Sequence, residues 1–162
     1  MATAIHSATA MFPRRATSHP HLADLRSDLD LSLEDLITLL DLAAQVKTAT
    51  GGKATKVILD TSRYRGPTLQ PTWDPDDVAA GNIAPITPLM LDGGRVDPTQ
   101  QDGARVTDPT RQAGLAVAKL LGLGPSAVVE GIAPPNGKEL GEVVSAPISE
   151  LVEHLLQTSD NV

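Results

Sequence analysis

Cysteine is absent from the 162-residue sequence, which excludes disulfide frameworks, cysteine-rich zinc sites and cysteine nucleophiles. Aromatic residues make up only 2% of the chain, too few for the stacking surfaces that bind single-stranded nucleic acid. Basic residues are outnumbered, 13 against 20 acidic ones, and the net charge of -7 is opposite in sign to that of most proteins that bind phosphate backbones. No apolar run approaches the roughly 18–20 residues that a membrane-spanning helix needs. The composition therefore favours a protein that binds neither nucleic acid nor membrane.

Acidic side chains are also missing from residues 1–23, and Asp24 is the first one. An acid-poor N-terminus that bears arginine and serine is typical of organellar transit peptides, and flexible arms are common at chain ends. Both interpretations stay open. The sequence predicts an arm or transit segment over 1–23, a single domain over 24–158 and a polar tail over 159–162. We expect a cytoplasmic protein, or an imported one if residues 1–23 are a transit peptide.

Hydrophobic periodicity predicts three helices. Apolar residues recur at helical spacing over residues 33–47, where Ser32 is suited to cap the start. Gly51-Gly52 ends this helix. Further helices are predicted after Pro109 and Pro147, because proline is favoured in the first turn of a helix.

Two short apolar runs, 56–59 and 127–129, predict buried strands. Between them, residues 66–109 are rich in Pro, Gly, Asp and Thr, which predicts a long irregular stretch. Its aspartate cluster at 74–77 lacks the spacing of a calcium loop, and we expect no metal and no cofactor. The order of elements predicts an α/β fold: a small, mostly parallel sheet with flanking helices and a long Pro/Gly-rich irregular middle.

Hydrogen-bond donors follow the first predicted strand, at Thr61, Ser62, Arg63 and Arg65. Arginine binds carboxylate and phosphate groups bidentately, and ligands of open α/β sheets bind beyond the carboxyl ends of the strands. This pattern predicts an anion-binding site. The alternative is an ordinary solvated loop, because most exposed charges contribute little.

The stretch 31–65 resembles the N-terminal part of aspartate and ornithine carbamoyltransferases. In that family a helix and a strand precede a Ser-Thr-Arg-Thr-Arg motif, and here Thr61-Ser62-Arg63-Tyr64-Arg65 stands in its place. Pro98-Thr99-Gln100 is similar to the family's His-Pro-Thr-Gln segment, with Asp97 where its histidine would be. The resemblance implies a transferase that binds carbamoyl phosphate and passes its carbamoyl group to an amino-acid amine. The substrate-binding residues that it implies are Thr61, Ser62, Arg63, Arg65 and Gln100.

Two alternatives stay open. Gly81-Asn82-Ile83, Gly93-Gly94, residues 110–125 and residues 127–130 resemble the C-terminal part of 3,4-dihydroxy-2-butanone 4-phosphate synthase, which implies a degenerate enzyme of that kind. The long irregular stretch, and the lack of a counterpart to the second carbamoyltransferase domain, favour instead a non-catalytic interaction or assembly protein, such as an accessory subunit or a virion-type structural protein. The expected partners are a small phosphorylated substrate and either further copies of the chain or a larger protein.

Overall fold

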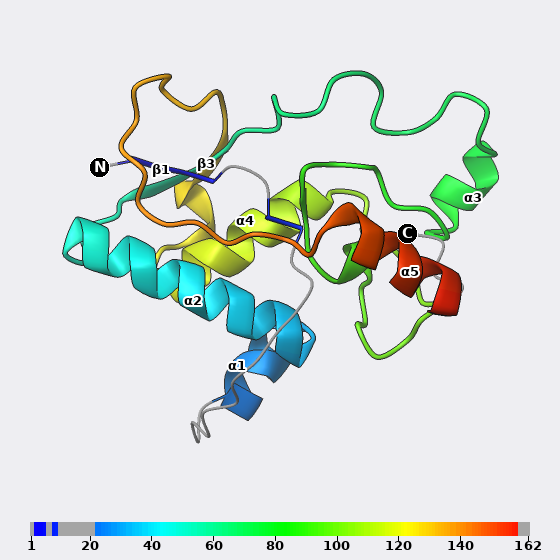
Figure 1. Cartoon of the computed structure of the whole chain (residues 1–162), viewed down its shortest axis with the longest axis horizontal. Coiled ribbons are helices and arrows are strands. Elements are labelled where there is room, and N and C mark those ends of the chain that lie inside the picture. Colours follow the sequence, from blue (N-terminus) through cyan, green and yellow to red (C-terminus); the bar gives the residue numbers. More distant parts are fainter. Residues whose placement is uncertain (1, 6–7, 10–21, 159–162) are drawn as a thin grey trace.

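The computed structural model describes residues 2–5, 8–9 and 22–158 (Figure 1). Its helices and strands confirm the predicted α/β class, with a small parallel sheet and flanking helices. In chain order the elements are β1 (Ala2–Ile5), β2 (Ala8–Thr9), α1 (Leu22–Leu29), α2 (Leu33–Thr50), β3 (Lys56–Leu59), α3 (Pro75–Ala79), β4 (Leu89–Met90), the 3-10 helix η1 (Asp92–Gly94), α4 (Pro109–Leu120), the 3-10 helix η2 (Pro125–Ala127), β5 (Val128–Glu130) and α5 (Ile148–Thr158).

The larger sheet has the strand order β1-β3-β5, and both pairs are parallel. Val57 in the central strand β3 is opposite Thr3 on one side and Val128 on the other. Parallel neighbours require crossover connections. The chain between β1 and β3 contains α1 and α2, and the chain between β3 and β5 contains α4. Residues 2–5 fall within the segment for which the sequence predicted an arm. In the structure they form the edge strand β1, whereas most of that segment lies outside the described residues.

Residues next to its two ends determine where helix α2 begins and ends. The Ser32 hydroxyl accepts a hydrogen bond from the backbone N–H of Asp35 at 3.2 Å, which confirms the predicted cap. At the other end Gly51 adopts a left-handed conformation (φ 61°), which glycine enters without a Cβ clash. The helix buries one leucine-rich face in the core, made of Leu36, Leu39, Leu42, Ala43 and Val46.

Helix α4 contacts both α2 and the sheet. The Asp108 carboxylate caps its start by accepting a hydrogen bond from the N–H of Arg111 at 2.8 Å, and Pro109 occupies the first turn as predicted. Gly114 lies directly over the sheet, where an added Cβ would overlap the Leu59 side chain and lie 3.1 Å from Val128 Cγ1. A glycine at this position therefore lets the helix pack against β3 and β5 at short range.

The irregular middle of the chain, residues 66–109, is tied together by backbone hydrogen bonds. It contains α3, β4 and η1, and β4 forms a second, two-stranded parallel sheet with β2. Val106 N–H donates to the Gly94 carbonyl at 2.7 Å, and Arg105 N–H donates to the Gly81 carbonyl at 2.6 Å. The segment is thus ordered by its own turns rather than by long helices or strands.

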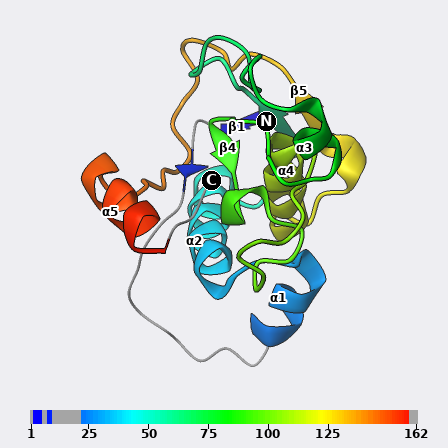
Figure 2. The ribbon, with the colours of Figure 1, turned by 90° about the vertical axis from the view of Figure 1, so that its right-hand side faces the viewer.

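Helix α5 stands apart from the packed body (Figure 2). It follows residues 131–147, which run without helix or strand alongside α2 (Figure 1). None of residues 148–157 is buried. Among the described residues, no helix combines the length and apolar character needed to cross a membrane.

Candidate functional site

The exits of β3 and β5 are joined by Asp60, which is 3% exposed. Its Oδ1 accepts a hydrogen bond from the N–H of Ser62 at 2.9 Å, and its Oδ2 accepts one from the N–H of Ala133 at 2.7 Å. Charge-assisted bonds of this kind offset the cost of burying a carboxylate. Asp60 therefore holds the loop after β3 and the chain after β5 in a fixed relation.

A cavity of about 940 Å³, here called the strand-exit basin, opens beside these loops. Thr61, Arg63 and Arg65 line it, together with residues 85–88 and the start of α4. Ser62 does not line the basin; its N–H is used by Asp60. The structure thus brings together three of the five residues that the sequence singled out, at the carboxyl end of the strand as expected.

Gln100, the fifth of those residues, is not among the residues that line the basin. Its Nε2 donates to Asp97 Oδ2 at 2.9 Å, while Asp97 Oδ1 accepts hydrogen bonds from the Thr99 hydroxyl at 2.6 Å and the Thr99 N–H at 2.9 Å. These bonds, with the hydroxyl of Thr99 foremost, lower the pKa of Asp97 below its usual value. The residues form a self-contained surface turn, so Gln100 has a structural partner and no place in the basin.

The charges of the strand-exit basin are mixed. Arg63 and Arg65 contribute positive charge, but Glu130 and Asp108 also line the cavity. The carboxylate of Asp108 already occupies the start of α4, where a phosphate would otherwise be favoured. A dianionic phosphate would meet two carboxylates here, which is a physical reason against the predicted carbamoyl-phosphate site.

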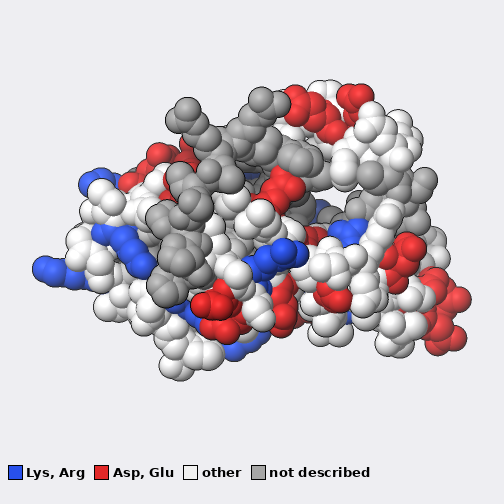
Figure 3. All heavy atoms as spheres, turned by 90° about the horizontal axis from the view of Figure 1, so that it is seen from below, with Lys and Arg blue, Asp and Glu red and all other residues white. Residues whose placement is uncertain are grey.

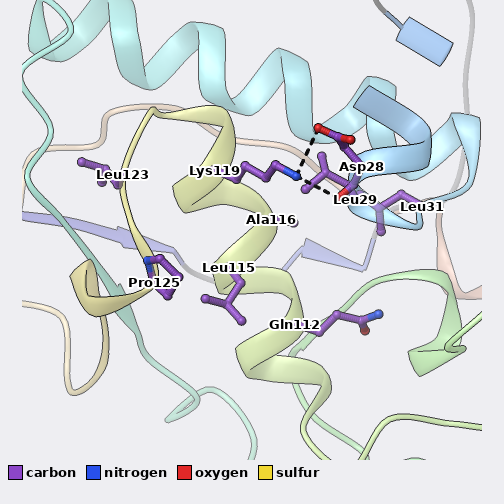
Figure 4. Close-up of a pocket in the computed structure, with 9 residues that line it drawn as sticks. All are labelled: Asp28, Leu29, Leu31, Gln112, Leu115, Ala116, Lys119, Leu123 and Pro125. Carbon is purple, nitrogen blue, oxygen red and sulfur yellow. Dashed lines mark hydrogen bonds and ion pairs between the residues drawn. The ribbon is translucent and has the colours of Figure 1, made fainter. Parts of the chain in front are cut away.

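A second cavity, of about 330 Å³, lies between α1 and α4 (Figure 4). Leu29, Leu115 and Leu123 give it an apolar lining. At its rim the Lys119 ammonium donates to the Asp28 carbonyl at 2.8 Å and lies 3.5 Å from the carboxylate of the same residue. This ion pair joins α1 to α4 across the cavity, and Gln112 is the other polar side chain of the lining.

Two carboxyl groups meet beside the start of α2. Asp35, 4% exposed, accepts at Oδ2 a hydrogen bond from the N–H of Asp92 at 2.5 Å. In return Asp92 Oδ2 accepts the N–H of Ser32 at 3.0 Å. Burial, and next the charge of Asp92, raise the pKa of Asp35 to about 7. This pair locks η1 onto α2, and it lies apart from both cavities.

Metal and polyanion sites find little support in the described part of the chain. No group of three or more His, Asp or Glu side chains there is placed to hold a metal ion. On the face seen in Figure 3, the visible Lys and Arg side chains are interspersed with Asp and Glu rather than gathered in one patch. The geometry alone therefore leaves the strand-exit basin with a lining of mixed charge and assigns no ligand or reaction to it.

Comparison with known proteins decides the family. Residues 3–110, two thirds of the chain, match the D-Ala-D-Ala carboxypeptidase 3 (S13) family. The chain belongs to this family. Carboxypeptidase DacB of Mycolicibacterium smegmatis is 44% identical over 125 residues, and a carboxypeptidase of Mycobacterium tuberculosis is 41% identical over 122 residues. Each alignment covers 75% of this chain but only 26% of the relative, so the chain spans about a quarter of their length. No solved structure matches.

Membership of the S13 family overturns the functional predictions made from sequence. The carbamoyltransferase resemblance was wrong, and so was the expected transferase activity, because the relatives are carboxypeptidases, which hydrolyse peptides. Neither the butanone-phosphate synthase nor the non-catalytic assembly alternative is supported. The resemblance misled because an amphipathic helix followed by a buried strand with a polar exit is common to many α/β proteins.

One tripeptide in the S13 chain escaped the sequence analysis. Ser159-Asp160-Asn161 was assigned to a polar tail, but Ser-Asp-Asn is one of three short motifs of penicillin-recognising serine enzymes, with Ser-x-x-Lys and Lys-Thr-Gly. The other two do not occur in the 162 residues. The tripeptide lies outside the described residues and follows α5 directly in sequence. The motif could have been recognised from the sequence, because its three residues are adjacent and follow a predicted amphipathic helix.

Proposed function

We propose that this chain serves a serine D-Ala-D-Ala carboxypeptidase by supplying the Ser-Asp-Asn tripeptide of its active site. The observation that carries the proposal is Ser159-Asp160-Asn161, directly after α5, in a chain of the S13 family. Enzymes with this motif use the serine of Ser-x-x-Lys as nucleophile. That serine attacks the carbonyl between the two D-alanines, the terminal D-Ala leaves, and water then hydrolyses the acyl-enzyme.

The roles open to this chain follow from its side chains. Ser159 offers a hydroxyl that donates and accepts hydrogen bonds, and Asn161 offers an amide that does both at separate atoms. Such groups can relay a proton to the leaving amine and orient the peptide substrate. The nucleophilic serine would come from sequence that corresponds to the remaining three quarters of the relatives.

A chimera tests the proposal. Residues 1–162 replace the matching quarter of the M. smegmatis relative, and release of D-alanine from a peptide ending in D-Ala-D-Ala is measured. The unaltered chimera should be active, and Ser159→Ala should reduce kcat by about 10²–10⁴-fold, the range for loss of a group that assists proton transfer. Gln157→Ala, two residues earlier, is the matched control and should retain activity.

Two results would contradict the proposed function. One is a folded chimera that releases no D-alanine. The other is a Ser159→Ala chimera whose rate equals that of the unaltered one.

A further inference from the structure

Opposite charges line the strand-exit basin without neutralising one another. Arg63 and Arg65 come from the loop after β3, and Glu130 comes from the end of β5. Within the described residues, none of these three side chains forms an ion pair or a hydrogen bond. The fourth charged side chain of the lining, Asp108, is engaged in the cap of α4. Unpaired charges of both signs in one cavity suit a ligand that itself carries both signs.

Apolar side chains lie in the same lining. Tyr64 is 49% exposed, Ile86 is 54% exposed and Ile132 is 72% exposed, and all three line the basin. With about 940 Å³, the basin is near the upper end of the range for small-molecule sites, which is about 300–1,000 Å³. Its size and lining therefore suit a peptide of several residues with aliphatic side chains, rather than an inorganic anion or a single amino acid.

Hydrogen bonds and prolines hold the walls of the basin in place. The carboxylate of Asp60 ties the loop after β3 to the chain after β5, as described above. The N–H of Ile86 donates to the carbonyl of Thr68 at 2.7 Å, which ties residues 66–68 to residues 85–88. A preformed site loses little conformational entropy when a ligand binds. The lining also contains four prolines, in which φ is fixed: Pro67, Pro85, Pro88 and Pro109.

One buried hydroxyl at the edge of the basin has no partner. Thr110, in the first turn of α4, is 8% exposed and lines the basin. Its Oγ1 makes no hydrogen bond in the structure, and a buried polar group without a partner costs free energy. Threonine in a helix has two accessible χ1 rotamers. The Thr110 hydroxyl can therefore turn toward the basin and bond to a ligand there.

We propose that the strand-exit basin binds a short peptide whose amino and carboxyl ends are both free. The guanidinium groups of Arg63 and Arg65 bind its carboxylate, and the carboxylate of Glu130 binds its ammonium group. The hydroxyl of Thr110 bonds to the peptide backbone. The basin lies entirely within the described α/β body, so this inference does not depend on the proposed function.

Calorimetric titration of the 162-residue chain tests the proposal. The probe is the tetrapeptide Ala-Leu-Leu-Ala, whose leucines suit the aliphatic lining, in four forms: free, N-acetylated, C-amidated and blocked at both ends. The free form should bind. Each block should weaken binding about 10-fold or more, because it removes a charge-assisted hydrogen bond.

Charge variants identify which side chain binds which end of the peptide. Arg63→Gln should weaken binding of the free peptide about 10-fold, and should leave the affinity for the C-amidated form unchanged. Glu130→Gln should do the same for the free peptide, and should leave the N-acetylated form unchanged. Lys53→Gln and Glu139→Gln, which change exposed charges outside the basin, are the matched controls and should bind all four forms like the wild type.

The hydroxyl of Thr110 has a different expected signature. Thr110→Val keeps the shape of the side chain and removes the hydroxyl. It should weaken all four forms by a similar factor of about 3–10, because the hydroxyl bonds to the backbone rather than to an end. Its Tm should not fall, since the hydroxyl has no partner in the free protein. Thermal unfolding of every variant checks that it is folded.

Four results would overturn the proposal. The first is a free peptide that does not bind at millimolar concentration. The second is an affinity that is the same for the free form and for the form blocked at both ends, which would assign the basin to an internal protein segment. The third is a folded Arg63→Gln variant that weakens the free and C-amidated forms equally. The fourth is inorganic phosphate that binds more tightly than the free peptide, which would assign the basin to an anion alone. Release of D-alanine by the chimera tests the proposed function separately, whichever of these results is found.

Discussion

The carboxyl groups of Asp35 and Asp92 lie close together where α2 meets η1. Asp35 is buried at 4% exposure, and the N–H of Asp92 donates to its carboxylate at 2.5 Å. Burial is the main reason that the pKa of Asp35 rises to about 7, and the negative charge of Asp92 is the next. The neighbouring Glu34 adds to the effect, and the backbone N–H of Asp92 partly opposes it. The folded protein therefore favours the protonated form of Asp35.

The pH dependence of stability follows from this shift. In the unfolded chain Asp35 titrates at its ordinary value of 3.8, so between about pH 4 and pH 7 the folded state binds a proton that the unfolded state has released. Stability contributed by this group is complete below pH 3.8 and falls as the pH rises, levelling above about pH 7. At 1.36 kcal/mol per pKa unit, a change from 3.8 to about 7 amounts to at most about 4 kcal/mol.

Asp35→Asn imitates the protonated carboxyl. The amide oxygen can still accept the N–H of Asp92, and the amide nitrogen can donate to the Asp92 carboxylate. At pH 8 the variant should exceed the wild type by about 2–3 kcal/mol, which raises Tm by roughly 4–12 °C at 2–4 °C per kcal/mol. At pH 4 the two proteins should be nearly equal. Urea unfolding followed by circular dichroism at several pH values measures the free energy of unfolding, and thermal unfolding at the same pH values measures Tm. Asp102→Asn, at an exposed turn, is the control.

Parallel stability curves for the wild type and Asp35→Asn between pH 4 and pH 8 would refute this reasoning. A variant less stable than the wild type at pH 8 would refute it as well. In either case the ionised Asp35 would be accommodated at no cost, contrary to its burial beside Asp92.

Two packing contacts give further predictions. Gly114→Ala should lower the free energy of unfolding by about 1–3 kcal/mol, because the added methyl overlaps the side chain of Leu59. Gly124→Ala, where nothing lies within 4 Å and φ is -80°, should be nearly neutral in the same urea titration. Gln45→Ala should speed hydrogen exchange at the Glu142 amide about 10-fold or more, since the N–H loses its acceptor. An unchanged exchange rate would show that the chain before α5 is not held by Gln45.

Local signals predicted α2, α4, α5 and the central strand β3, whereas α1 and α3 were missed. The Ser32 cap, the Gly51 stop and the Asp108-Pro109 start act through neighbouring residues, and the structure places α2 and α4 accordingly. The strand β1 was missed because Ala2–Ile5 has no pattern of its own and becomes a strand only through pairing with β3. The partner of Asp35 was also beyond reach, because Asp92 is 57 residues away in sequence.

Prediction of the candidate site from sequence has the same limit, because side chains from distant segments meet there. Thr61, Arg63 and Arg65 were correctly placed at the end of a strand, because that needs only the strand itself. Their ligand could not be predicted, since Glu130 and Asp108 enter the same basin from segments far away in sequence and change its charge. Ser159-Asp160-Asn161 is the reverse case: three adjacent residues carry the information, whatever the fold around them. A contiguous chemical motif therefore weighs more for function than a longer match built from helix periodicity, since periodicity reports burial, which many unrelated proteins share.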